Sequence, residues 1–195
     1  MIQKNILLLF TSCILILSSC GNDTPKEKLD DIKSDASNFE DGVSTAMAYN
    51  DGVISELTLL ELKFMDLNSQ LENGPDENYP ETYTACLQEH KRVKDVIYKV
   101  TPAGIGGSDF KNAALDYINA YGVLVDFLAP DMVVEIMDES MDEMSELALG
   151  FAGAYTKFEN ANIALSEAQE IFARKNDSYI DEESINIDEL YEETK

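Results

Sequence analysis

Apolar residues recur at alternating steps of four and three along a stretch that begins at Phe39, a spacing that places them on one face of an α-helix. Ser37 and Glu40 have the spacing of a capping box, which marks a helix start. The stretch ends at Asn73-Gly74-Pro75, because Gly tolerates a left-handed turn and Pro cannot continue a helix. We therefore predict a first long helix over about 37–72.

The same periodicity returns three more times and predicts helices over about 80–101, 108–128 and 131–175. Pro80 suits the first turn of its helix, and Ser108 can cap the next one. No alternation typical of strands is sustained. Four amphipathic helices joined by short loops cannot bury their apolar faces alone, so the predicted fold is all-α, an antiparallel four-helix bundle of unequal helices.

The first nineteen residues read as a targeting segment, with one basic residue, Lys4, followed by an apolar run too short to span a bilayer comfortably. The run ends at Leu17-Ser18-Ser19-Cys20-Gly21, which resembles a bacterial lipobox. That resemblance implies cleavage between Ser19 and Cys20 and lipidation of Cys20 with acyl chains such as palmitate. Gly21 after the anchor is compatible with sorting to the outer membrane, so we expect a lipoprotein of the cell envelope.

The remaining chain divides into three parts by composition. Residues 20–36 are polar and mixed in charge and predict a flexible tether behind the lipid. Residues 37–176 carry the helical periodicity and form the predicted bundle domain. Residues 177–195 form an acidic tail, which we expect to be largely solvated or docked through Tyr179 and Ile180.

Composition narrows the possible functions. The 195 residues include 38 acidic and 14 basic ones, for a formal charge of -24, which argues against nucleic acid as a partner. A single His excludes sites built from two or more imidazoles, such as the usual zinc hydrolases and di-iron bundles. Removal of the targeting segment and lipidation of Cys20 would leave Cys86 as the one thiol, so no internal disulfide is expected.

Three segments resemble landmarks of an uncharacterised family of bacterial lipid-anchored surface proteins. They are Ala48-Tyr49-Asn50-Asp51, the segment Asp109 to Leu115 and the segment Ala168 to Lys175. The resemblance covers most of the mature chain and implies a helical extracytoplasmic lipoprotein. It supplies no activity and no functional residues.

Two groups of side chains have the spacing of metal ligands. Cys86 and His90 stand four apart on one helix face, although two ligands are too few for a closed metal site, and both also suit the core. Met137, Met141 and Met144 offer thioethers that favour Cu(I), and His90 with one Met could ligate haem. Core packing is the favoured interpretation of each group, and we predict no cofactor and no resident metal.

The predicted fourth helix also carries an acidic stripe with no basic residue between Asp131 and Gly150. It could collect Ca²⁺ or meet a basic partner, although a solvated face is the favoured interpretation. Its members are Glu135, Asp138, Glu139, Asp142, Glu143 and Glu146.

Three amides, Asn50, Asn162 and Gln169, fall on or near apolar stripes. If they face one another, an internal hydrogen-bond cluster is as good an interpretation as a ligand site.

The sequence therefore favours a lipid-anchored envelope protein that is not an enzyme and acts as an interaction or structural module. Its expected partners are the membrane, through the N-terminal lipid, and another envelope protein. The alternative is a carrier of a small ligand or of copper, haem or calcium, which would use the bundle interior or the acidic face.

Overall fold

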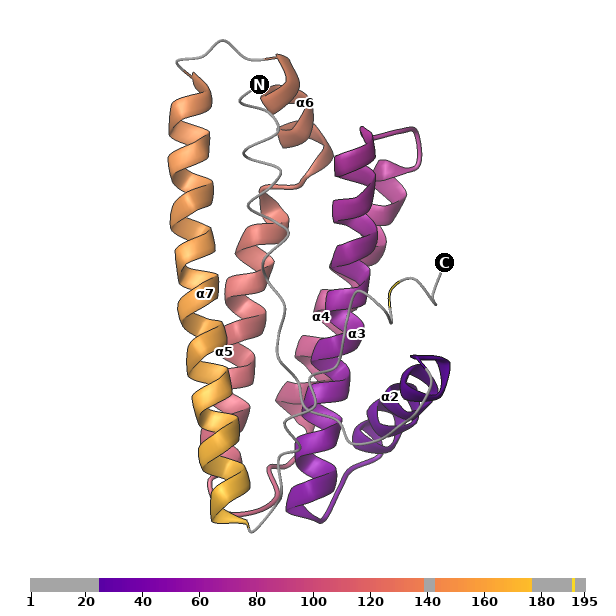
Figure 1. Cartoon of the computed structure of the whole chain (residues 1–195), viewed down its shortest axis with the longest axis vertical. Coiled ribbons are helices and arrows are strands. Elements are labelled where there is room, and N and C mark those ends of the chain that lie inside the picture. Colours follow the sequence, from indigo (N-terminus) through magenta and orange to yellow (C-terminus); the bar gives the residue numbers. More distant parts are fainter. Residues whose placement is uncertain (1–24, 139–142, 177–190, 192–195) are drawn as a thin grey trace.

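The computed structural model describes residues 25–138, 143–176 and 191 of the chain. Every regular element within these ranges is an α-helix (Figure 1), which confirms the all-α class for this part of the chain. The helices are α2 (Pro25–Glu40), α3 (Ala46–Asn73), α4 (Tyr79–Lys99), α5 (Gly107–Asp126), α6 (Pro130–Asp138) and α7 (Glu143–Lys175).

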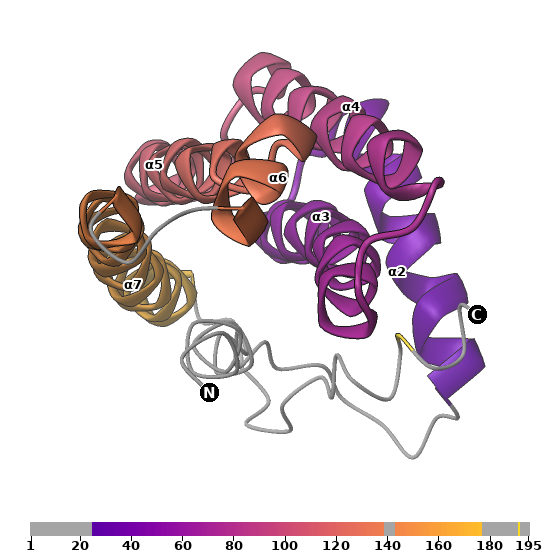
Figure 2. The same cartoon turned by 90° about the horizontal axis from the view of Figure 1, so that it is seen from above.

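Helix α3 occupies the centre of the fold. It packs extensively against α2 and α4 and more lightly against α5 and α7, while α5 packs against both α4 and α7. Figure 1 shows α3, α4, α5 and α7 lying alongside one another and α2 lying obliquely beside α3. Seen from above, α2 lies on the side of α3 that faces away from α7 (Figure 2).

Local chemistry explains where α3 and α5 begin and where α3 ends. The Thr45 hydroxyl accepts a hydrogen bond of 3.1 Å from the backbone N–H of Ala48 and so caps the first turn of α3. At the other end, Gly74 has a φ of 89°, which a residue without a Cβ adopts at low cost. Helix α5 begins at Gly107 behind Gly106, whose φ is 85°, so the predicted capping role of Ser108 is wrong.

The predicted flexible tether over 20–36 is wrong from Pro25 onward. Residues 25–40 form α2, whose buried face consists of Leu29, Ile32, Ala36 and Phe39. The proposed capping box of Ser37 and Glu40 lies in the last turn of this helix, and the true start of α3 follows eight residues after Ser37, at Thr45. Phe39 therefore belongs to α2, where it contributes to a short apolar stripe of its own.

A small residue on α3 makes this packing possible. An added Cβ at Gly52 would lie only 2.3 Å from Cδ2 of Phe39, so the Phe39 ring rests directly on the α3 backbone. Before Phe39 the sequence shows only three apolar residues at helical spacing. So few apolar residues do not reveal whether the segment packs against the domain or stays in solvent, and only the contact with Gly52 decides this.

The predicted fourth helix over 131–175 is also corrected, because two helices, α6 and α7, cover this stretch. Residues 139–142 between them lie outside the described residues. The sequence offers a physical reason against one continuous helix, since acidic residues crowd this stretch without a basic residue to offset their repulsion.

Aromatic rings from four helices form the lower part of the core. Tyr49 of α3 is fully buried, and its ring centroid lies 5.6 Å from that of Phe39, 6.3 Å from that of Phe110 and 6.0 Å from that of Phe172. Such pairs contribute about 0.5–1.5 kcal/mol each beyond the burial of their area. Tyr49 thus links α2, α5 and α7 through one side chain of the central helix.

None of the described helices is long and apolar enough to cross a membrane.

Replacement of Leu57 by Ala tests the assignment of the core. Leu57 is fully buried on α3, so its truncation should lower the free energy of unfolding by about 2–5 kcal/mol. Leu149→Ala is the matched control, because Leu149 is 73% exposed and its truncation should change stability by less than about 0.5 kcal/mol. Urea unfolding followed by circular dichroism measures both, and equal midpoints for the two variants would contradict the assignment.

Candidate functional site

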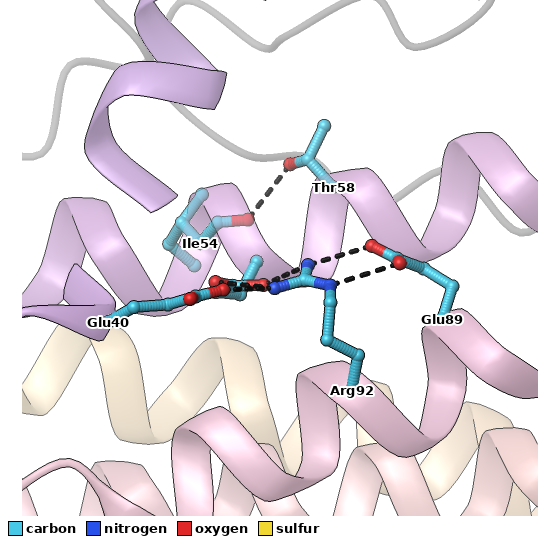
Figure 3. A network of polar contacts seen from close by, with 6 residues as sticks. Glu40, Ile54, Thr58, Glu89 and Arg92 are labelled. Atoms are coloured by element: carbon cyan, nitrogen blue, oxygen red, sulfur yellow. Dashed lines mark hydrogen bonds and ion pairs between the residues drawn. The ribbon is translucent and has the colours of Figure 1, made fainter. Parts of the chain in front are cut away.

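The most extensive polar network described joins three helices around Arg92 of α4 (Figure 3). Its guanidinium donates 3.2 and 2.5 Å hydrogen bonds to the two oxygens of Glu56 on α3. It donates 3.0 and 2.7 Å bonds to the two oxygens of Glu89, one turn earlier on α4. A 2.6 Å ion pair to Glu40 adds the last turn of α2. One side chain therefore holds α2, α3 and α4 together.

The side chains of this network differ in how far they are exposed to solvent. The Glu56 side chain is fully buried, whereas those of Arg92 and Glu40 are 35% and 47% exposed. Burial raises the pKa of Glu56, and the hydrogen bond and charge of Arg92 oppose that rise. Hydrogen bonding to Glu89, with further support from Glu56, raises the pKa of Arg92 above its ordinary value. Arg92 therefore neutralises a carboxylate that the interior could not otherwise hold.

Figure 3 also shows that Thr58, one turn beyond Ile54, turns its hydroxyl back to its own helix. The Thr58 hydroxyl donates a 3.0 Å hydrogen bond to the Ile54 carbonyl and is thereby satisfied although the residue is fully buried. This side chain needs no ligand.

A second buried carboxyl lies further along α3. Glu61 is 6% exposed and accepts a 2.5 Å hydrogen bond from the Tyr117 hydroxyl of α5. Its other oxygen, Oε2, has no hydrogen-bond partner among the described residues. Burial raises the pKa of Glu61 to about 8, although the Tyr117 hydrogen bond acts in the opposite direction. Glu61 is therefore mostly uncharged at neutral pH.

Aromatic rings cluster around Tyr117, the hydrogen-bond partner of this carboxyl. The Tyr117 ring lies 5.1 Å from that of Phe158 on α7 and 5.9 Å from that of Tyr121, and Tyr121 in turn lies 5.1 Å from Phe64 on α3. The raised pKa of Glu61 follows from its burial, because a buried carboxyl loses the water that would solvate a negative charge.

Two of the three amides singled out from the sequence face one another. Gln169 of α7 donates a 3.1 Å hydrogen bond to the Asn50 side chain of α3, across 119 residues of sequence. The prediction of an internal contact is confirmed for this pair. The Asn162 side-chain oxygen is buried without a hydrogen-bond partner among the described residues. The Asn50–Gln169 bond fixes the register of α7 against α3.

Cys86 and His90 lie in different environments, the first buried and the second hydrogen-bonded to a backbone carbonyl. Cys86 is fully buried, and burial raises the pKa of its thiol to about 12, which keeps the sulfur protonated and unreactive. His90 Nε2 lies 2.8 Å from the Ile118 carbonyl, so Nε2 carries a proton and donates it to that oxygen. The ring lies against Gly122 of α5, where an added Cβ would approach Nε2 to 2.8 Å.

Over the described ranges, no group of three or more His, Cys, Asp or Glu side chains is placed to hold a metal ion. Much of the predicted Met and acidic stripe lies outside what the structure describes. Glu135, Met137 and Asp138 lie in α6, and Glu143, Met144 and Glu146 lie in α7, but their side chains are not described. Glu139, Met141 and Asp142, together with Ser19 and Cys20, lie outside the described residues.

Sequence reasoning missed a cleft between α3 and α4. It has a volume of about 480 Å³ and is lined by Lys63, Asp66, Ser69, Gln70, Glu81, Thr82, Ala85 and Tyr191. Gln70 donates a 2.8 Å hydrogen bond to Thr82 across the two helices. Tyr191 belongs to the acidic tail and is only 7% exposed. The sequence signal was one of two tyrosines in a charged segment, and helical periodicity could not show which of them is buried or where.

A comparison with protein-family models, with curated proteins and with solved structures finds no match for this chain. The family resemblance of the three segments stays a prediction.

Replacement of Arg92 by Met tests the network. The change leaves the buried Glu56 carboxylate without its cation, so it should lower the free energy of unfolding by about 3 kcal/mol. This value is at the low end for a broken buried ion pair, because Arg92 is partly exposed. The double variant R92M/E56Q should recover part of this loss. Arg174→Met is the control, since its 3.3 Å pair with Glu170 is exposed and contributes at most about 1 kcal/mol. Equal losses for R92M and R174M would refute the role of Arg92.

Replacement of Glu61 by Gln tests the buried carboxyl through pH. Glu61 has a folded-state pKa of about 8 against an ordinary value of 4.5, so the folded protein binds more protons than the unfolded chain between these values. The stability that Glu61 contributes is therefore present below about pH 4.5 and is lost as pH rises toward 8. The advantage of E61Q over the parent should grow from pH 5 to pH 8, by at most about 1.4 kcal/mol per pH unit.

Glu81→Gln is the control for this measurement, because Glu81 is exposed on α4. Its stability difference from the parent should stay flat over the same range of pH in urea unfolding. A flat difference for E61Q as well would show that Glu61 ionises normally in the folded protein.

Proposed function

We propose that this protein is a lipid-anchored module of the cell envelope that holds a folded helical surface close to a membrane and acts through protein contacts, not catalysis. The N-terminal pattern supports the anchor, since an apolar segment ends at a lipobox-like sequence with Cys20 as the lipidated residue. Two or three acyl chains would anchor such a protein stably. The proposed location is the outer membrane.

The observation that carries this proposal is the position of α2. The helix begins at Pro25, five residues after Cys20, and packs against α3 through its apolar face. Five extended residues span at most about 17 Å, whereas a tether reaching to Ser37 would span about 60 Å. An anchor at Cys20 would therefore keep the helical domain next to the bilayer.

In this proposal the core of the module is an antiparallel four-helix bundle formed by α3, α4, α5 and α7, with α2 bound across it. The contacts of α3 with its neighbours and of α5 with α4 and α7 support this description. The formal charge of -24 disfavours adhesion to anionic headgroups, so the favoured partner is an envelope protein with a basic surface.

The environment of Cys86 and His90 favours the module over an enzyme or a carrier. Burial raises the pKa of the Cys86 thiol and keeps it protonated, and the His90 imidazole is hydrogen-bonded to the Ile118 carbonyl. Nucleophilic catalysis needs a thiolate or an activating base next to the nucleophile, and neither side chain supplies it. The carrier stays the alternative, and its Met and acidic residues are those whose side chains the structure does not describe.

Replacement of Cys20 by Ala tests the anchor. The variant should lose its lipid and move from the membrane fraction to the soluble fraction, because acyl chains supply about 0.8 kcal/mol of membrane affinity per buried methylene. Cys13→Ala is the matched control, since Cys13 precedes the cleavage point and should not affect anchoring. Detergent partitioning followed by mass spectrometry measures both, and an unlipidated but membrane-bound C20A protein would contradict the proposal.

A further inference from the structure

Helix α7 carries apolar residues on its solvent side as well as on its buried side. Its buried side packs mainly against α5 and more lightly against α3, and α7 lies at the edge of the body when the protein is seen from above (Figure 2). On the solvent side, Leu149 is 73% exposed, Ile163 57% and Ile171 44%. A helix that is apolar on opposite sides is normally covered on both.

The solvent side of α7 also has few charges for this protein. Of the ten exposed residues between 149 and 164, only Lys157 and Glu159 are charged. Helix α4 likewise has ten exposed residues, and five of them are charged. The formal charge of -24 repels a second copy over most of the surface. The solvent side of α7 is therefore a place where two copies can approach with little local repulsion.

The exposed residues on this side have the spacing of a two-stranded coiled coil. Leu149, Thr156 and Ile163 stand seven residues apart. Gly153 and Asn160 fall between them, so the line advances by alternating steps of four and three residues. At about 100° per residue, the five positions lie within about 80° of one another around the helix. We call these five residues the α7 seam.

We propose that the α7 seam is a contact surface for a second copy of this protein, and that the two α7 helices pack side by side in parallel. This inference goes beyond the proposed function and does not depend on the lipid anchor. The resulting dimer has two-fold symmetry, so each seam residue faces the same residue of the other copy.

The charges beside the seam favour a parallel pair over an antiparallel one. Lys157 and Lys175 are exposed on one flank of the seam, and Glu159 and Glu170 are exposed on the other. In a parallel pair the two-fold axis runs along the helices, so each basic flank faces an acidic flank of the other copy. In an antiparallel pair each flank faces the like flank, and the lysines would repel one another.

The polar and small residues of the seam suit this arrangement. Asn160 would face its counterpart, and its side-chain amide both donates and accepts hydrogen bonds, so two such side chains can pair. A single Asn in a coiled-coil seam favours one register and one oligomeric state. An added Cβ at Gly153 would meet no atom of the described residues within 4 Å, so the second helix can approach closely there.

The length of the seam sets the strength of the dimer. From Leu149 to Ile163 the helix rises about 21 Å. A stable interface buries about 800 Å² on each partner, and one helix face of this length buries less. The dimer is therefore weak and reversible, and a covalent trap is the suitable way to measure it.

The experiment traps the dimer by disulfide formation between single cysteines in the full chain. Thr156→Cys and Ile163→Cys each place a thiol on the seam, next to its counterpart in the other copy. Ser166→Cys is the matched control, because Ser166 is exposed on α7 but lies about 60° outside the seam. Mild oxidation should give about tenfold more cross-linked dimer for each seam variant than for S166C. The yield is counted above that of the parent, whose Cys86 is buried.

A second pair of variants removes the contact itself. Ile163→Glu, introduced together with T156C, places two like charges in the seam and should reduce the cross-link to the level of S166C. Ile105→Glu in the same T156C protein is the control, since Ile105 is 66% exposed on the connection between α4 and α5. It should leave the cross-link unchanged. Both isoleucines are exposed, so neither replacement should shift the unfolding midpoint.

Three results would overturn the proposal. The first is an equal yield from seam and control cysteines, or no cross-linked dimer from any of them. The second is cross-linking through only one of T156C and I163C, because an antiparallel pair can bring only one of two positions seven residues apart next to its own counterpart. The third is a cross-link that I105E removes as fully as I163E does.

Discussion

The charge pairing around Arg92 is the interaction on which the arrangement of α2, α3 and α4 depends. Glu56 is fully buried on the central helix, and a buried carboxylate needs a cation with directed hydrogen bonds. Arg92 provides both and uses its remaining donors for Glu89 and Glu40. Because Glu40 lies in the last turn of α2, the side chain that neutralises the interior also fixes the N-terminal helix to the domain.

Other polar contacts set the remaining helices in register without creating an open reactive centre among the described residues. Gln169 and Asn50 join α7 to α3, Tyr117 and Glu61 join α5 to α3, and the Tyr79 hydroxyl donates a 2.7 Å hydrogen bond to the Leu128 carbonyl. Apolar packing alone tolerates sliding between helices, whereas these pairs favour one alignment. These pairs therefore set how α5 and α7 align against the central helix α3.

Helix limits that depend on local periodicity could be predicted from the sequence. Features that depend on contacts between residues far apart in the chain could not. The limits of α4 and α5 agree with prediction within two residues, because Pro80 and the glycines around 106 mark them locally. Helix α2 was missed because its short apolar face is stabilised by Gly52 and Arg92, which lie far along the chain. The sequence suggested a core position for His90, which is only partly buried, and the pairing of Glu61 with Tyr117 and the burial of Tyr191 beside the α3–α4 cleft required the fold.

The most direct test of this account measures the distance between α2 and α4 in solution. Spin labels at Lys33→Cys and Lys94→Cys occupy exposed positions on the two helices, and pulsed electron spin resonance reports their separation. Docking by Arg92 predicts one narrow distance distribution, which should broaden when Arg92 is replaced by Met. A broad distribution in the parent protein, unchanged by that replacement, would show that α2 is not held to the domain and would contradict the account.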